Sequence, residues 1–202
     1  MTYGESARTA ARRTRSTILA ALAVVSAALV GVLIYQSLAS SAVLHGDHRG
    51  ALGEADGAVP DGVTVFDDEI PAVANLDPDL LGALRHAATD AADDGVEFFV
   101  NSGWRSPQYQ EQLRQKAVSE YGSAEEAARW VATADKSLHV SGDAVDIGPA
   151  NATAWLSQHG AEYGLCQIYS NESWHYELRP KAVDRGCPRR YADPTHDPRM
   201  RQ

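Results

Sequence analysis

Two short stretches of the sequence carry side chains that bind metal ions and transfer protons. The first contains His139 and Asp146, and the second, further along the chain, contains Glu172 and His175. Zinc accepts imidazole nitrogens and carboxylate oxygens as ligands, and a catalytic zinc keeps three protein ligands and one open position. His139, Asp146 and His175 therefore form a candidate ligand set, and Glu172 is a candidate general base for a zinc-bound water. These residues predict a hydrolase.

The residues around the first pair support its convergence on one point. Gly142 lies between His139 and Asp146 and permits a tight turn with positive φ. Taken alone, the pair is also compatible with a buried histidine bonded to the backbone and a solvated aspartate. Likewise, Glu172 can be a carboxylate on a solvated loop, and His175 can be an edge-strand histidine. The presence of both motifs in one chain favours the metal site.

Three motifs together resemble the zinc D-alanyl-D-alanine carboxypeptidases, the VanY-like family that is related to the D-Ala-D-Ala dipeptidases. The resemblance covers most of the segment from Val96 to Leu178. The motifs are Ser102-Gly103-Trp104-Arg105-Ser106, Ser137-x-His139-x-x-Gly142-x-Ala144-x-Asp146, and Glu172-x-Trp174-His175.

The resemblance implies a role for each motif residue. The three candidate ligands bind one Zn²⁺, Glu172 acts as the base, and Arg105 binds or polarises the substrate. Ser137 and Gln110 fall where the family pattern places polar groups on the substrate side. Trp104, beside Arg105, is expected to form a wall of the peptide cleft and to contact substrate, whereas Trp174 is expected to pack in the core.

The expected activity is removal of the terminal D-alanine from peptidoglycan stem peptides by a Glu-activated zinc-bound water. Three alternatives stay open: a D-Ala-D-Ala dipeptidase, a peptidoglycan endopeptidase, and a non-catalytic wall-binding module that contains zinc. Glu172 argues against the last, because a structural zinc site needs no base and is usually closed by a fourth ligand.

The distribution of charge argues against a nucleic-acid partner. Residues 45–202 hold 14 of the 18 basic and 26 of the 27 acidic residues, which gives this part of the chain a net charge of −12. Affinity for nucleic acid depends on Lys and Arg neutralising phosphates. An acidic domain instead fits a protein that uses a local positive group to hold an anionic peptide.

The N-terminal region predicts export. Residues 16–44 contain no charged side chain, and the apolar run is long enough to cross a bilayer as a helix. Arg8, Arg12, Arg13 and Arg15 precede it, so the positive-inside rule places the N-terminus in the cytoplasm and the rest of the chain outside. The expected location is therefore the cell membrane, with one span and an extracytoplasmic catalytic domain. Secretion after signal-peptide cleavage is the alternative.

Composition and periodicity divide the chain into five parts. We expect a basic cytoplasmic tail over 1–15, a transmembrane anchor over 16–38, a flexible linker over 39–62, a zinc peptidase domain over 63–190, and a loosely ordered polar tail over 191–202. Both cysteines, Cys166 and Cys187, follow the anchor, where thiols oxidise and stay oxidised. We therefore expect a disulfide between them, although two unpaired core cysteines are the alternative.

The predicted domain is of the α+β class. A small antiparallel sheet carries the metal site and helices pack on one side of it. We expect helices over 78–92, from 107 onward, over 124–133 and over 152–163, with Asp77, Ser123 and Asn151 as N-caps. We expect strands over 96–100, 144–147, 166–169 and 174–178, the last two as antiparallel neighbours, and a loop over 134–140 that carries His139.

Overall fold

The computed structural model describes residues 52–201. The expected cytoplasmic tail (1–15), transmembrane anchor (16–38) and first part of the linker (39–51) lie outside the described residues. Within residues 52–201, every helix is too short or too polar to cross a membrane.

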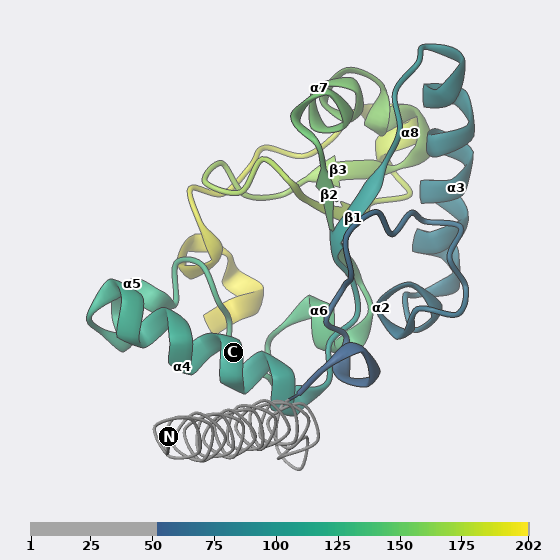
Figure 1. Cartoon of the computed structure of the whole chain (residues 1–202). Coiled ribbons are helices and arrows are strands. Elements are labelled where there is room, and N and C mark those ends of the chain that lie inside the picture. The colour runs from purple at the N-terminus through teal and green to yellow at the C-terminus, as the bar shows by residue number, and fades with distance from the viewer. Residues whose placement is uncertain (1–51, 202) are drawn as a thin grey trace, which may run out of the picture. The chain divides into compact units, whose positions relative to one another are not determined.

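Four strands form one sheet in the order β1-β2-β4-β3 (Figure 1). Every neighbouring pair is antiparallel, so the expected small antiparallel sheet is confirmed, and so is the pairing of its last two strands. The strands are β1 (Phe99–Ser102), β2 (Ala144–Gly148), β3 (Leu165–Gln167) and β4 (His175–Leu178).

One face of the sheet packs against helices. Side chains alternate along a strand, so Val145, Ile147 and Tyr176 share this face and are fully buried. They join one hydrophobic core with apolar side chains of α3 (Pro78–Asp93) and α7 (Ala150–His159). The helical members of the core are Leu80, Leu84, Ala87, Ala88, Ala91, Ala152, Trp155 and Leu156.

The opposite face carries the polar residues of the two central strands. Asp146 of β2 lies directly across from His175 of β4, and Ala144 lies across from Glu177. Because residues two apart point to the same side, His175 and Glu177 share this face with Asp146. The pairing of β2 with β4 thus places three ionisable side chains next to one another.

The two long helices begin where the sequence predicts. Asp77 caps α3 by accepting hydrogen bonds from the amides of Asp79 and Leu80, at 3.0 and 3.1 Å. Ser106 caps α4 (Pro107–Tyr121) by accepting from the Tyr109 amide at 3.1 Å. Proline follows the cap in both helices, where its missing N–H costs no hydrogen bond.

Several other boundaries differ from the sequence prediction. The strand expected over 96–100 is β1, which starts only at Phe99. The helix expected over 124–133 is a single turn, α5 (Ala124–Ala127). Beyond this turn, Trp130 stacks on Tyr121 of α4, with ring centroids 5.8 Å apart.

Two further differences concern short helices and caps. The expected loop that carries His139 contains a helical turn, α6 (Leu138–Ser141). Asn151 is not an N-cap, because α7 starts at Ala150, two residues before the predicted start, and Pro149 occupies the capping position. The remaining short elements are η1 (Glu54–Asp56), α2 (Pro71–Ala74), η2 (Gly160–Tyr163), α8 (Ala182–Arg185), η3 (Pro194–His196) and η4 (Pro198–Arg201).

Both ends of the described chain pack onto the domain. Asp56, in the segment assigned to the linker, accepts hydrogen bonds from the Ser106 amide at 2.8 Å and the Ser106 hydroxyl at 3.1 Å. The expectation of a loosely ordered C-terminal tail is wrong. Tyr191 pairs with the backbone next to Tyr169, and Asp193 is buried. Polar partners and apolar contacts both hold this tail in place, because Tyr191 and Met200 also pack against a small hydrophobic cluster around Tyr169.

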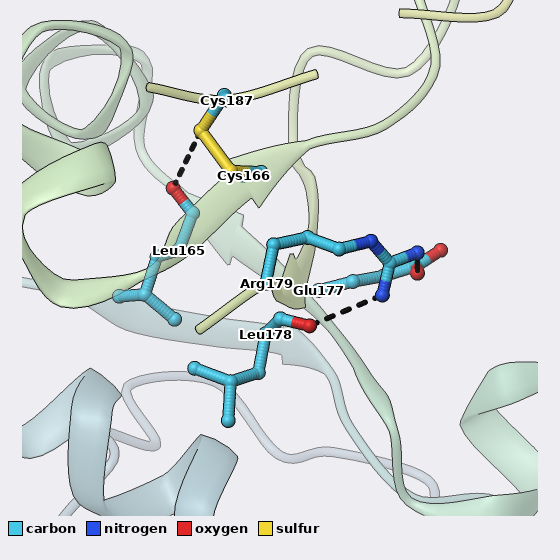
Figure 2. The surroundings of a disulfide bond; sticks show 6 residues. All are labelled: Leu165, Cys166, Glu177, Leu178, Arg179 and Cys187. Atoms are coloured by element: carbon cyan, nitrogen blue, oxygen red, sulfur yellow. Dashed lines mark hydrogen bonds and ion pairs between the residues drawn. A yellow bond between two sulfur atoms is a disulfide. The ribbon is translucent and has the colours of Figure 1, made fainter. Parts of the chain in front are cut away.

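A disulfide joins Cys166 of β3 to Cys187, which precedes the C-terminal tail. Figure 2 shows it beside β3, with Arg179 at the end of β4 nearby. The bond closes a loop over a sequence separation of 21 and brings the start of the tail back to the sheet.

Candidate metal centre

His139, Asp146 and His175 converge on one buried point. Each offers a ligand atom, and these atoms all lie within 4.8 Å of one another. His139 Nε2 lies 3.4 Å from Asp146 Oδ1, and His175 Nδ1 lies 3.1 Å from the same oxygen. Gly142 ends α6 with φ +82°, which turns the chain directly from His139 into β2, as the sequence predicts.

The spacing of these atoms fits a tetrahedral zinc ion. Bonds of 2.0–2.2 Å place neighbouring ligand atoms about 3.3–3.6 Å apart. The two distances to Asp146 Oδ1 lie near this range. Two imidazoles and one carboxylate are also a donor set that catalytic zinc sites use, with one position left for water or substrate.

The second nitrogen of His139 has a partner that fixes its tautomer. His139 Nδ1 donates to the Gly103 carbonyl at 2.8 Å, so Nε2 presents its lone pair to the metal point. Burial and the nearby charge of Arg105 lower the pKa of His139, while Asp146 opposes this shift. A neutral imidazole is the form that binds a metal. Position 103 itself requires a glycine, because the Cβ of any other residue would lie 2.0 Å from the Ala72 carbonyl oxygen.

Glu177 contacts the second nitrogen of His175. Its Oε1 lies 3.4 Å from His175 Nε2, which leaves Nδ1 facing the metal point. Burial alone lowers the pKa of His175, but hydrogen bonds to Asp146 and Glu177 raise it to about 10. Two carboxylates therefore favour a cation at this ring, and a metal ion and a proton compete for Nδ1.

Glu172 lies at the edge of the ligand set without joining it. Its Oε2 is 3.8 Å from His175 Nδ1, and its side chain is buried. Burial raises the pKa of Glu172 to about 7, although the charge of His175 opposes the shift. A carboxylate with a pKa near neutrality can accept a proton and release it again, as a general base requires.

Arg105 connects the ligand set to the neighbouring loop. Its Nη2 lies 3.2 Å from Asp146 Oδ2, whereas both histidines contact the other oxygen, Oδ1. Its other nitrogens donate to Ser102 Oγ at 2.7 Å and Gln110 Oε1 at 3.1 Å. These bonds hold a guanidinium group at the metal point, where it can contact an anionic or polarised substrate atom.

A cleft of about 320 Å³ opens onto the metal point. The three ligands, Glu172 and Arg105 line it, together with Ser137 and Gln110. Gln110 is fixed at both ends of its amide, because its Nε2 also donates to the Ala132 carbonyl at 2.9 Å. A cleft of this size with a few convergent polar groups is typical of a ligand site.

The structure places Trp174, and not Trp104, in the lining of the cleft. Trp104 does not line the cleft, whereas Trp174 lines it and is 39% exposed. Trp174 immediately precedes β4, so its side chain is not confined to the face that packs on α3 and α7. The cleft wall expected from Trp104 is therefore formed in part by Trp174.

Sequence reasoning missed several contributors to the site. The Gly103 carbonyl was not detectable, because any residue carries one. Tyr121 and Trp130 also line the cleft, but their stacking depends on how the segment around α5 packs on α4. Pro194 and Met200 of the C-terminal tail also line the cleft, in a segment whose sequence resembles a disordered tail.

Comparison with known proteins links this geometry to one family. The chain matches the family model of VanY, D-alanyl-D-alanine carboxypeptidase, over residues 73–181, which is more than half of the chain. This segment includes all three candidate ligands, Glu172 and Arg105.

Individual relatives agree with the family match. A D-alanyl-D-alanine carboxypeptidase from Enterococcus faecalis is 30% identical over 139 residues, covering 55% of this chain and 52% of the relative. The chain thus spans about half the length of that curated relative. The structure of VanYB in complex with D-alanine-D-alanine is 26% identical with a TM-score of 0.51, covering 55% of this chain and 74% of that chain.

A structure of a mutant vancomycin-resistance D,D-pentapeptidase VanY in complex with Zn(II) also matches. It is 26% identical with a TM-score of 0.48, covering 51% of this chain and 72% of that chain.

Proposed function

Because this chain belongs to the VanY family of D-alanyl-D-alanine carboxypeptidases, we propose that it is a zinc metallopeptidase that removes the terminal D-alanine from peptidoglycan stem peptides. One observation carries the proposal. A buried His-Asp-His set with spacing that fits zinc adjoins a buried carboxylate, Glu172, whose pKa is raised to about 7. A structural metal site requires no such carboxylate.

The ligands and the base have distinct tasks in this proposal. His139, Asp146 and His175 would hold the zinc ion, which when bound supplies Lewis acidity that activates water and polarises the scissile carbonyl. Glu172 accepts the proton that the attacking water loses. It then returns this proton to the amine of the departing D-alanine, since a group with a pKa near 7 serves in both directions.

Arg105 supplies positive charge on the other side of the ligand set. It either pairs with the terminal carboxylate of the peptide or stabilises the developing oxyanion. Its bonds to Ser102 and Gln110 fix the guanidinium before substrate arrives. Little reorganisation is then needed during the reaction.

Two measurements on the full chain test the proposal. Zinc content is determined by metal analysis, and released D-alanine is followed by mass after incubation with a pentapeptide ending in D-Ala-D-Ala and with free D-Ala-D-Ala. The proposal expects about one zinc per chain and release of one D-alanine from the pentapeptide. Cleavage of only the free dipeptide would favour a dipeptidase, and cleavage within the pentapeptide would favour an endopeptidase.

The variant Glu172→Ala separates catalysis from metal binding. We expect zinc content to stay at the wild-type level while hydrolysis falls by at least about 10²-fold, because the base is lost and the ligands remain. Unchanged hydrolysis would remove Glu172 from the mechanism. Zinc binding without hydrolysis in the wild-type protein would favour a non-catalytic wall-binding module.

We also propose that the domain acts outside the cytoplasm and is attached by the apolar segment over 16–38. The supporting observations are the uncharged run that follows four arginines and the disulfide between Cys166 and Cys187. Protease added to intact cells should digest the domain; protection from protease would contradict this location.

A further inference from the structure

The carboxylate of Glu177 is buried and has several cationic neighbours. Glu177 is 0% exposed and contacts the metal ligand His175 through Oε1. Arg179 pairs with Oε2. Arg199 spans both oxygens, with Nη1 2.8 Å from Oε2 and Nη2 3.2 Å from Oε1. Because a buried carboxylate must be paired, these arginines determine where it lies.

Arg199 constrains the carboxylate more strongly than Arg179. A guanidinium that bonds to both oxygens fixes the plane of a carboxylate as well as its position. Arg179 reaches only Oε2. It is also close to Glu177 in sequence, whereas Arg199 arrives from a separation of 22 residues.

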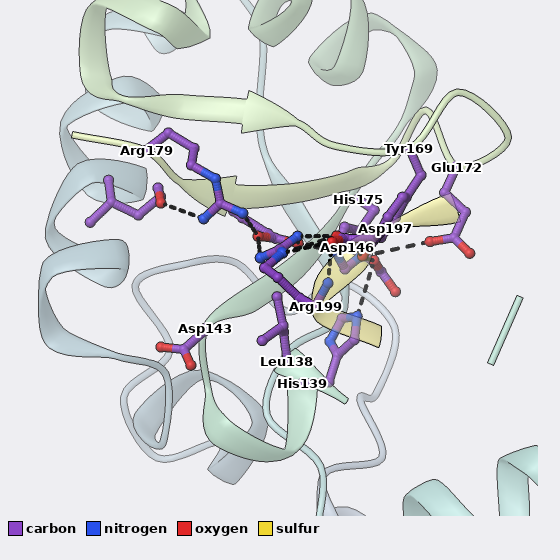
Figure 3. Close-up of polar contacts among 12 residues, drawn as sticks. Leu138, His139, Asp143, Asp146, Tyr169, Glu172, His175, Arg179, Asp197 and Arg199 are labelled. Atoms are coloured by element: carbon purple, nitrogen blue, oxygen red, sulfur yellow. Dashed lines mark hydrogen bonds and ion pairs between the residues drawn. The ribbon is translucent and has the colours of Figure 1, made fainter. Parts of the chain in front are cut away.

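Arg199 is itself held by a second buried carboxylate. Its Nε lies 3.1 and 3.0 Å from the two oxygens of Asp197, which is 0% exposed. Asp197 Oδ2 also accepts from the Tyr169 hydroxyl at 3.1 Å, and the Tyr169 ring lies 5.2 Å from the His175 ring. Figure 3 shows this network reaching from Arg199 to the metal ligands.

Two members of the network come from a part of the chain outside the family match. That match ends at residue 181, and Asp197 and Arg199 belong to the C-terminal tail. The same tail contributes Pro194 and Met200 to the wall of the cleft. The tail is therefore connected both to the substrate cleft and, through Glu177, to a ligand of the metal.

We propose that Arg199 is a positioning residue of the metal centre, which holds Glu177 in place and thereby keeps Nδ1 of His175 turned toward the metal. This inference rests on the proposed function, since it requires a metal at the His-Asp-His set. Without Arg199, the carboxylate loses its two-point contact, and the His175 ring gains freedom to rotate away. Partners of this kind typically change metal affinity by 10–100-fold.

The test measures metal binding by the full chain and does not depend on turnover. Zinc affinity is determined by competition with a chromophoric chelator, and ligand geometry is followed by the absorption spectrum of the Co²⁺ form. For Arg199→Met we expect zinc affinity to fall about 10–100-fold and the Co²⁺ spectrum to change. Arg199→Lys keeps the charge but loses the guanidinium group that contacts both oxygens, so its zinc affinity should lie between those of the wild type and Arg199→Met.

Two further variants keep the test decisive. The double variant Asp197→Asn/Arg199→Met removes the charge of both partners, so it avoids an unpaired carboxylate if Arg199→Met alone fails to fold. Arg185→Met changes an exposed arginine of α8 and should retain wild-type affinity. Thermal melts of the metal-free proteins confirm that the compared variants are folded.

Each outcome separates this inference from the proposed function. Unchanged zinc affinity and an unchanged Co²⁺ spectrum in folded Arg199 variants would overturn the inference and leave the metallopeptidase intact. A wild-type protein that binds no zinc would overturn both. An equal loss of affinity in Arg185→Met would show a general charge effect and would also overturn the inference.

Discussion

The two ring nitrogens of each histidine in the metal centre have different partners. In His139, Nδ1 donates to a backbone carbonyl and Nε2 faces the metal point. In His175 the arrangement is inverted, with Nε2 near Glu177 and Nδ1 facing the metal point. Asp146 likewise divides its oxygens between the histidines and Arg105. Each ligand thus has one polar atom for the metal and another that fixes its orientation.

The three contacts of the Arg105 guanidinium group lead to a prediction at the residue scale. Arg105→Lys keeps the charge but cannot reach Ser102, Gln110 and Asp146 together. We expect kcat/KM for the pentapeptide to fall by about 10²–10³-fold, with zinc content unchanged. Arg114→Lys, on α4, serves as the control and should leave kcat/KM unchanged. Wild-type kcat/KM in Arg105→Lys would show that a point charge suffices at this position.

At the scale of elements, short turns do most of the positioning. The helical turn α6 and its C-terminal Gly142 turn the chain so that His139 and Asp146 face one point. The turn also packs tightly, because a Cβ at Gly142 would lie 2.5 Å from the Asn75 carbonyl oxygen. The antiparallel pairing of β2 with β4 then places His175 across from Asp146.

Two glycines test the importance of this packing. Gly142 and Gly122 both have positive φ, at +82° and +85°, but a Cβ at Gly122 meets nothing within 4 Å. Gly122→Ala should cost about 1–2 kcal/mol of unfolding free energy from backbone strain alone. Gly142→Ala should cost a further ~1–3 kcal/mol, because the Asn75 segment must move. Urea unfolding measures both values; equal costs would contradict close packing at α6.

At the scale of the whole domain, the C-terminal tail joins elements that are distant in sequence. Asp193 accepts from Arg129 Nε at 3.1 Å, across a separation of 64 residues. Asp197 bonds to Tyr169, and Arg199 bonds to Glu177 on β4. The disulfide brings the start of this tail to β3. These contacts attach the tail to the domain, and Pro194 and Met200 of the tail line one part of the cleft.

The attachment of the tail predicts a dependence of stability on pH. Burial opposes the ionisation of Asp193, but hydrogen bonds from Thr195, His196 and Arg129 lower its pKa to about 2. Because the folded pKa lies below the unfolded value, Asp193 stabilises the fold above about pH 4, and this contribution is lost as the pH falls toward 2. The full contribution is on the order of 2 kcal/mol.

Urea unfolding between pH 5 and pH 2 measures this contribution. The stability difference between wild type and Asp193→Asn should be largest at pH 5 and should shrink as the pH falls. Asp184→Asn, at an exposed carboxylate of α8, is the control and should show no such trend. A difference that stays constant across this range would show that Asp193 acts without its charge.

The sequence by itself determined the features that depend on nearby residues. Asp77 and Ser123 cap their helices because the amides that they bond to lie two or three residues away. The alternation along β2 and β4 assigns Asp146 and His175 to the polar face whatever covers that face. The motif residues point to a zinc peptidase because their types and order are read directly from the chain.

Only the tertiary structure decided which distant groups complete the site. The contact of the Gly103 carbonyl with His139, the two-point contact of Arg199 with Glu177 and the place of Trp174 in the cleft depend on how distant segments of the chain come together. The polar composition of the tail predicts disorder. Composition does not reveal that Asp193, Asp197 and Arg199 bond to residues on other elements. These contacts form only when the sheet and helices bring the distant residues together, so local sequence patterns do not predict them.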